Sequence, residues 1–134
     1  YSTAIPPTVL GAMDATLDLL PTLGKTRARL LQQADDLRAT WHAAGLDCGQ
    51  STTQIVPLVV GEDNKARDLS CALEEIGFLV VAIRPPTVPE GTSRLRFAIS
   101  AAHETEDLAR LKEAVVRLAA SKPSGSQKQK RVTS

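Results

Sequence analysis

Two arginines in the middle of the chain, Arg84 and Arg96, are the side chains best suited to bind a small anion. A guanidinium group is a planar fork of N–H donors that matches a carboxylate or a phosphate with two hydrogen bonds. Arg84 directly follows an apolar run, and Arg96 lies in a stretch where polar and apolar residues alternate. If neighbouring strands carry these arginines, both could converge on one anion. The spacing is equally compatible with two solvated strand-end charges, or with partners of nearby acids.

The elements expected to position these arginines are two strands joined by a stiff connection. Residues 78–83 form a short, valine-rich apolar run, which is typical of a strand covered on both faces. Three prolines and a glycine over residues 85–91 then restrict the backbone, and a proline cannot donate to a sheet. From Arg94 onward the period becomes two. Arg96 is therefore predicted to lie opposite the apolar face of its own strand.

The first third of the chain predicts two helices. Apolar residues recur with a helical period after Pro7 and stop at Pro21, which cannot continue a helix. A break is expected over residues 22–25. The next helical pattern is long and ends at Gly45, a residue type that suits a helix C-terminus.

The rest of the chain completes an α+β pattern. Residues 55–60 have the composition of a strand, although Pro57 requires an edge position or a bulge. Two further helices are expected, one ending at Gly77 and one capped by Thr105. With short connections, this order predicts a small, mainly antiparallel sheet that carries helices on one side.

Length and composition limit the class of protein. The chain has 134 residues, of which 43% are hydrophobic and 23% charged, as expected for one soluble globular domain. It contains no signal peptide pattern and no apolar run of about 18 residues, so we expect no membrane span. Residues 121–134 hold four basic residues and no acid, so the first 120 carry a net charge of −3. Because the excess basic charge lies in this tail and only 3% of residues are aromatic, no nucleic-acid binding is expected.

The other reactive side chains form no recognisable catalytic or metal site. Cys48 and Cys71 have neither metal-ligand spacing nor a disulfide framework, which fits a reducing cytoplasm. His42 and Trp41, in the long helix, are expected to be structural. His103, just before the last helix, is expected to be a structural hydrogen-bonding residue. We therefore predict no metal ion and no catalytic residue in this chain.

A longer motif adds to this interpretation. The sequence Ala-Ile-Arg-Pro-Pro-Thr-Val-Pro-Glu-Gly-Thr-Ser-Arg-Leu-Arg at residues 82–96, followed by Ser-Ala-Ala-His-Glu at residues 100–104, resembles the C-terminal signature of the α-oxoamine synthases. These are pyridoxal 5′-phosphate (PLP) enzymes of fold type I. The Pro-x-Gly-x-x-x-x-Arg core is shared by the family, whereas the preceding Arg-Pro-Pro-Thr is more typical of the 8-amino-7-oxononanoate synthases of biotin biosynthesis. The resemblance covers roughly residues 1–120, which correspond to about the last third of a complete member.

The resemblance implies a fold, a reaction and a set of site residues. The fold would be the C-terminal small domain of a fold type I enzyme. The complete enzyme would be a PLP-dependent acyltransferase that condenses L-alanine with a pimeloyl thioester, of CoA or a carrier protein, with decarboxylation. Arg96 would hold the amino-acid carboxylate, Arg84 would engage a carboxylate at a later step, and Thr87 would help to bind substrate. Ser2 and Thr3 would lie near the PLP phosphate of a neighbouring subunit.

The resemblance also implies that most of the enzyme lies outside this chain. Residues 1–24 would form an interdomain and first-helix segment, residues 25–120 the small domain, and residues 121–134 a disordered basic tail. The Schiff-base lysine of the family lies upstream of the segment that resembles residues 2–7. We therefore expect a fragment that is inactive alone, that needs a large PLP-binding domain, and that works in a homodimer with its active site at the subunit interface.

Two alternatives remain open. The chain could belong to a related α-oxoamine synthase, of the glycine C-acetyltransferase, 5-aminolevulinate synthase or serine palmitoyltransferase type. It could instead be a non-catalytic interaction domain whose arginines bind a small anion. The products formed from alanine, glycine or serine would separate the synthases from one another. PLP absorbance with and without a large domain would separate the enzyme from the binding domain.

Overall fold

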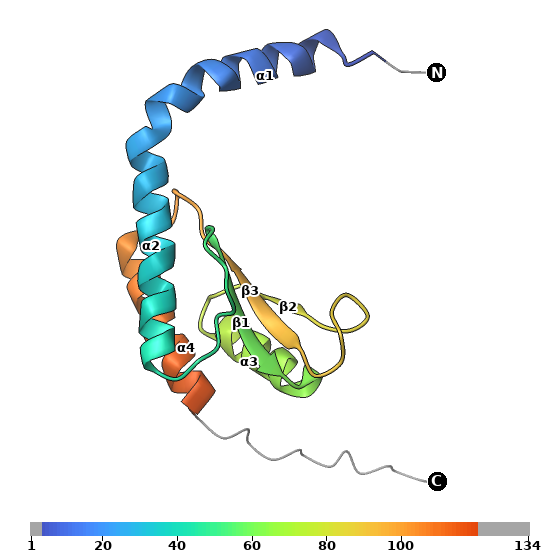
Figure 1. Ribbon diagram of the computed structural model, residues 1–134, viewed down its shortest axis with the longest axis vertical. Helices are drawn as coiled ribbons and strands as arrows, with labels where there is room; N and C mark the ends of the chain where they lie inside the picture. Colours follow the sequence, from blue (N-terminus) through green and yellow to red (C-terminus); the bar gives the residue numbers. More distant parts are fainter. Residues whose placement is uncertain (1–3, 121–134) are drawn as a thin grey trace.

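The computed structural model describes residues 4–120, which form helices and one three-stranded sheet (Figure 1). The elements are, in chain order, α1 (Pro7–Leu19), the 3-10 helix η1 (Leu20–Leu23), α2 (Gly24–Ala43), β1 (Ile55–Gly61), α3 (Asp63–Glu75), β2 (Val81–Ile83), β3 (Ser93–Ala98) and α4 (Thr105–Ala120). The predicted α+β class is confirmed. The predictions for Ser2, Thr3 and the basic tail concern residues outside the described range.

The sheet has the strand order β1-β3-β2, and both strand pairs are antiparallel. β3 is therefore central, and the strand that contains Pro57 lies at an edge, as predicted. An edge strand tolerates proline because one side of its backbone needs no ladder partner. The register of β1 against β3 shifts between Val59 and Gly61, just before the turn into α3.

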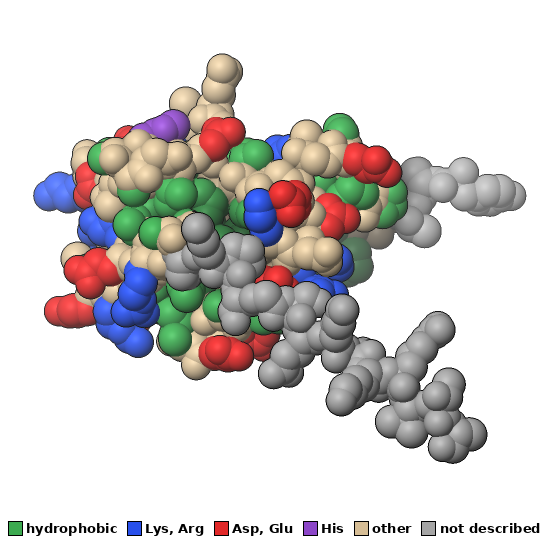
Figure 2. Space-filling model, turned by 90° about the horizontal axis from the view of Figure 1, so that it is seen from below, with side chains coloured by type: hydrophobic (Ala, Val, Ile, Leu, Met, Phe, Trp, Pro, Cys, Tyr) green, Lys and Arg blue, Asp and Glu red, His purple; other side chains and the backbone are tan. Residues whose placement is uncertain are grey.

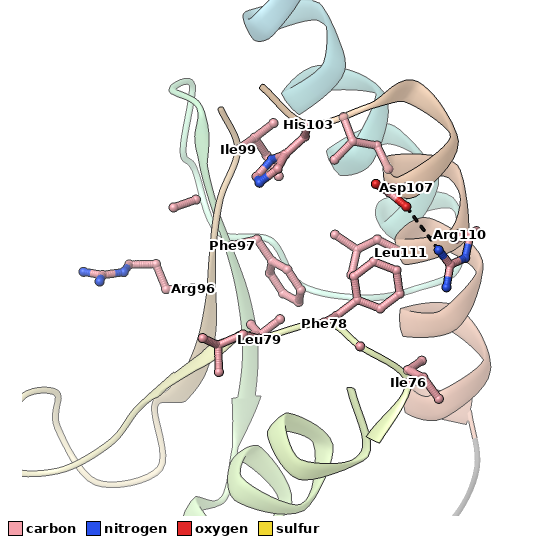
Figure 3. Close-up of a pocket in the computed structure, with 14 residues that line it drawn as sticks. Ile76, Phe78, Leu79, Arg96, Phe97, Ile99, His103, Asp107, Arg110 and Leu111 are labelled. Atoms are coloured by element: carbon pink, nitrogen blue, oxygen red, sulfur yellow. Dashed lines mark hydrogen bonds and ion pairs between the residues drawn. The ribbon is translucent and has the colours of Figure 1, made fainter. Parts of the chain in front are cut away.

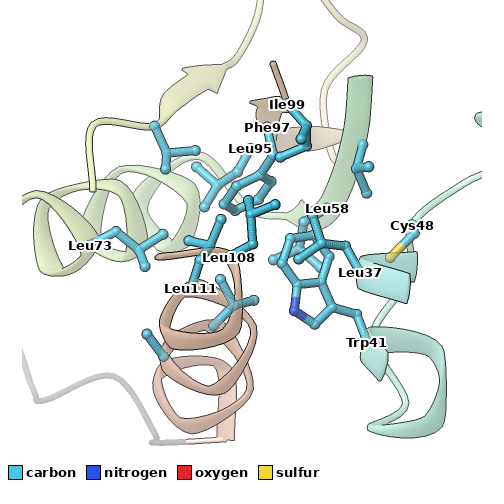
Figure 4. Close-up of a cluster of buried hydrophobic side chains, with 14 of the residues drawn as sticks. Leu37, Trp41, Cys48, Leu58, Leu73, Leu95, Phe97, Ile99, Leu108 and Leu111 are labelled. Carbon is cyan, nitrogen blue, oxygen red and sulfur yellow. The ribbon is translucent and has the colours of Figure 1, made fainter. Parts of the chain in front are cut away.

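One hydrophobic core lies between the sheet and three helices (Figure 4). β3 contributes its inward-facing residues, and α2, α3 and α4 supply the opposing side chains. Trp41 is fully buried and its ring lies 4.7 Å from the ring of Phe97, between centroids. The largest core side chains are Leu37, Trp41, Leu58, Leu73, Leu95, Phe97, Ile99, Leu108 and Leu111. Because the helices cover only one face, the other face of the sheet stays open within the described chain.

Helix α1 extends away from this core (Figure 1). None of its residues is buried, and among the described elements it contacts only η1. Its exposed apolar side chains include Val9, Leu10, Met13 and Leu17. The predicted break over residues 22–25 is confirmed in part: the two α-helices are interrupted, but at η1, because Pro21 fits the first turn of η1 and α2 already begins at Gly24. The chain bends at η1 and continues as helix.

The prediction of a strand covered on both faces at residues 78–83 is also wrong. β2 contains only Val81–Ile83 and lies at the edge of the sheet. Leu79 is 85% exposed and Val81 48% exposed. An apolar run indicates that a segment avoids water, but it cannot show that this chain supplies a cover for both faces. The outer side of β2 has no cover within residues 4–120.

The surface is mixed in character. On the face shown in Figure 2, acidic and basic side chains are interspersed around exposed hydrophobic ones. None of the helices in the described part of the chain is long and apolar enough to cross a membrane.

Candidate functional site

The candidate site is the open face of the sheet, with β3 at its centre. Leu95 and Phe97 point into the core, so alternation turns Arg94, Arg96 and Ala98 to the open face. Arg96 is exposed, and Figure 3 shows its side chain pointing away from Phe97. This confirms the predicted position of Arg96 opposite a packed apolar face.

The floor around Arg96 is apolar. Its cross-strand partners are Pro57 on β1 and Val81 on β2. Directly opposed residues of antiparallel strands point to the same face, so both border the guanidinium stem. No carboxylate is bonded to Arg96 within residues 4–120. An exposed guanidinium on an apolar floor without an acid can bind the carboxylate of a ligand with two hydrogen bonds.

Arg84 lies one residue beyond β2, where the proline-rich connection begins. Ile83 pairs with Arg94 and Val81 with Arg96, so Arg84 is displaced from Arg96 by three residues along the strand direction. At about 3.3 Å per residue this displacement is about 10 Å, which two arginine side chains reaching toward each other can span. The strand alternation does not set the direction of the Arg84 side chain, because β2 ends at Ile83. Convergence of Arg84 and Arg96 on one ligand stays a prediction.

The connection after Arg84 is a tight turn. The Thr87 N–H donates to the carbonyl oxygen of Arg84 at 3.0 Å, and the Pro85–Pro86 peptide bond is cis. Thr92 closes the other end by donating its hydroxyl to the Pro89 carbonyl at 2.7 Å. Thr87 itself is exposed. The Thr87–Arg84 and Thr92–Pro89 hydrogen bonds hold both ends of the loop that joins β2 to β3.

Arg94 is a site residue to which the sequence analysis gave no role. It is partly buried, and its Nε donates to the Thr92 carbonyl at 3.0 Å. The period-two pattern already placed Arg94 on the same face as Arg96, so the signal was present in the sequence. The tertiary structure adds that this face has no helix over it and that the apolar Val59 and Ile83 flank Arg94.

The buried polar groups beneath β3 fix the strand in place. Ser93 is fully buried, and its hydroxyl donates to the Asp63 carboxylate at the start of α3. The Ile99 N–H donates to the Gln54 carbonyl at 3.0 Å, just ahead of β1. These bonds lie at the two ends of β3, so the strand that carries Arg94 and Arg96 is tied to its neighbours at both ends.

The described residues do not form a PLP site by themselves. Lys65 is paired with Glu62 at 2.8 Å, Lys25 lies at the exposed start of α2, and Lys112 lies on α4. None of these lysines lines the open face. No group of side chains in residues 4–120 could hold a metal ion. The exposed guanidinium of Arg96 is chemically suited to an anionic group such as a carboxylate or a phosphate.

A hollow of about 480 Å³ lies between β3, residues 76–80 and α4, and Arg96 is among its lining residues although its side chain points away from Phe97 (Figure 3). The other polar side chains that line it are engaged locally. His103 Nδ1 accepts a hydrogen bond from the Ser100 N–H at 3.2 Å, which fits the expected structural role. Arg110 pairs with Asp107 at 3.1 Å and lies over the Phe78 ring, 5.5 Å from its centroid. The uncommitted charge among the lining residues is that of Arg96, whose side chain points to the open face.

Comparison with known proteins agrees with this geometry. The family model described as "Aminotransferase class I and II" matches residues 1–115. The chain belongs to the aminotransferase class I and II family. It is 51% identical over 115 residues to the 8-amino-7-oxononanoate synthase of Gluconacetobacter diazotrophicus, covering 86% of this chain and 29% of that protein. A relative from Magnetococcus marinus, given the same name provisionally, is 57% identical over 117 residues, covering 87% and 30%.

Solved structures of this family share the fold. The 8-amino-7-oxononanoate synthase of Francisella tularensis has a TM-score of 0.74 at 25% identity, covering 87% of this chain and 34% of that one. A structure of serine palmitoyltransferase (SPT) with PLP has a TM-score of 0.78 at 27% identity, covering 88% of this chain and 30% of that one. The chain thus spans about 30% of the length of the curated relatives it matches. The resemblance to 8-amino-7-oxononanoate synthases and the fold type I small domain are confirmed.

Proposed function

We propose that this chain is the C-terminal small-domain part of an 8-amino-7-oxononanoate synthase. The complete enzyme would condense L-alanine with a pimeloyl thioester, releasing carbon dioxide and the free thiol. The observation that carries the proposal is Arg96, exposed on an open apolar face within a motif shared with the α-oxoamine synthases. Up to 57% identity to proteins of that name supports it.

Arg96 would bind the carboxylate of alanine. Two parallel hydrogen bonds would hold the carboxylate in one orientation and thereby align the bond to be broken. The apolar floor of Pro57 and Val81 would keep water away from this pair, which strengthens the interaction. PLP, held by the large domain, supplies the electron sink for the chemistry.

Arg84 and Thr87 would act when the small domain closes. They lie on a loop that the Thr87–Arg84 backbone bond and the prolines already shape, so little ordering would be needed on closure. Arg84 would then engage a carboxylate at a later step, and Thr87 would contact substrate. We further propose that the complete protein is a cytoplasmic homodimer with its active site at the subunit interface, where Ser2 and Thr3 would contact the cofactor phosphate.

The test is an Arg96→Ala variant of the complete protein. Loss of two charge-assisted hydrogen bonds in a water-poor site should lower kcat/KM for alanine about 100-fold or more. Cofactor absorbance should be unchanged, because in this proposal Arg96 holds the substrate carboxylate and not PLP. Arg117→Ala is the matched control, since Arg117 is exposed on α4, which packs against the opposite face of the sheet. Wild-type kinetics for Arg96→Ala would rule out the proposed role.

A second candidate is a related synthase with another amino acid or acyl donor. The TM-score of 0.78 to SPT supports it, because the same small-domain fold serves that enzyme. Product analysis with alanine, glycine and serine distinguishes the two. Formation of 8-amino-7-oxononanoate from alanine supports the first proposal, and a clear preference for serine or glycine supports the second.

A further inference from the structure

Arg94 is a guanidinium on the open face whose ligand is not accounted for by the amino-acid carboxylate. Its cross-strand partners Val59 and Ile83 are apolar, so the aliphatic stem lies between hydrophobic neighbours. The Nε atom is committed to the Thr92 carbonyl at 3.0 Å. That bond orients the head group and leaves the two terminal nitrogens for a bidentate contact.

Neither Arg94 nor Arg96, the two arginines of β3 on the open face, has an ion-pair partner among the described residues. Arg38, Arg67 and Arg110 each have an aspartate within 4 Å, whereas Arg94 and Arg96, like the exposed Arg27, Arg29, Arg84 and Arg117, have none within residues 4–120. The nearest acid by register is Asp47, which is bridged to Val59, the β1 partner of Arg94, and which accepts a hydrogen bond from the Gly49 N–H at 2.8 Å. A single carboxylate on Arg96 would neutralise only part of the charge of Arg94 and Arg96. The face is therefore suited to ligands that bring more than one anionic group.

We propose that Arg94 binds an oxyanion of the acyl thioester substrate. This inference rests on the proposed function, in which alanine occupies Arg96. The second substrate carries the remaining negative charge, as phosphates on its carrier group and as a carboxylate at the far end of its acyl chain. Arg94 and Arg96 are two residues apart on one strand, about 7 Å, so two anions can lie side by side on this face.

The experiment measures thioester binding to the complete protein by isothermal titration calorimetry. Arg94→Gln should raise the Kd for pimeloyl-CoA about 10–100-fold, the effect of losing a charge-assisted contact. Arg94→Lys should restore part of the affinity, because it keeps the charge but loses the fork. Arg117→Gln, the matched surface control, should bind like the wild type. Circular dichroism checks that each variant is folded.

Three thioesters separate the two sources of the oxyanion. Heptanoyl-CoA lacks the distal carboxylate, and the pimeloyl thioester of N-acetylcysteamine lacks the phosphates. If Arg94 binds phosphate, Arg94→Gln weakens both CoA thioesters and spares the N-acetylcysteamine one. If it binds the distal carboxylate, the substitution weakens both pimeloyl thioesters and spares heptanoyl-CoA.

Two results would overturn the proposal. In one, Arg94→Gln binds all three thioesters as tightly as the wild type. In the other, Arg94→Gln raises the Kd for alanine as much as the Kd for the thioesters, with alanine binding measured through the absorbance of the bound cofactor. Failure of the proposed function would show differently. The wild-type protein would still bind the thioester but would form no 8-amino-7-oxononanoate.

Discussion

Replacing Trp41 or Phe97 should lower the free energy of unfolding of the chain, because both side chains pack behind the strand that carries Arg96. Trp41 on α2 is fully buried, Phe97 on β3 is nearly so, and their ring centroids are 4.7 Å apart. Truncating a buried aromatic residue to alanine costs about 3–5 kcal/mol, so a leucine, which refills part of the space, should cost about 2–3 kcal/mol at either position. The Trp41 Nε1 bond to the Lys112 carbonyl, at 3.4 Å, is long and should add little.

The contact between the two rings can be isolated with a double-mutant cycle. Aromatic pairs of this geometry contribute about 0.5–1.5 kcal/mol beyond their burial, so Trp41→Leu and Phe97→Leu together should cost less than the sum of the single changes by about that amount. Urea unfolding followed by circular dichroism gives the free energies. Leu79→Ala, at an 85% exposed position, is the control and should change stability by no more than about 0.5 kcal/mol. Strict additivity, or a cost below about 1 kcal/mol for Trp41→Leu, would refute the packing argument.

Two further predictions concern buried polar groups. Burial and the neighbouring Asp47 raise the pKa of the Cys48 thiol above its ordinary value of 9.0. As the pH rises, the thiol ionises first in the unfolded chain, so the free energy of unfolding should fall above about pH 9. Urea titrations at several pH values should show that Cys48→Ala reduces this fall. An unchanged dependence of stability on pH in Cys48→Ala would contradict the prediction. Ser93→Ala should cost about 1–2 kcal/mol by removing the bond to Asp63. Because both changes break one bond, adding Asp63→Ala should cost less than its own single effect, and full additivity would exclude that bond.

The residues of β3 show what a local sequence pattern can predict about the fold. Their strict alternation was enough to place Leu95 and Phe97 in the core and Arg96 on the opposite face, because side chains of a strand point to alternate sides whatever the strand packs against. The same reasoning failed for residues 78–83. An apolar run has no period that tells one covered face from two, and the described chain covers only one.

The position of Arg94 on the open face and the misplaced break near Gly24 were difficult to predict for different reasons. Arg94 was visible as a residue of the Arg96 face, but its lack of an acid partner depends on residues distant in the chain. The break was inferred from Pro21 and Gly24, whereas a proline in the first turn of a helix loses no hydrogen bond. Pro21 and Gly24 are compatible either with a non-helical break or with a bend between helices, and in the structure the chain bends at η1.

The sequence by itself determined the family, the α+β class and the face on which Arg96 lies, since motif, composition and periodicity are local properties. Only the tertiary structure decided that β3 lies between β1 and β2, which brings the end of β2 beside Arg94 and leaves one face of the sheet open. Strand order and the covering of a face depend on contacts between segments far apart in the chain. No window of neighbouring residues contains that information.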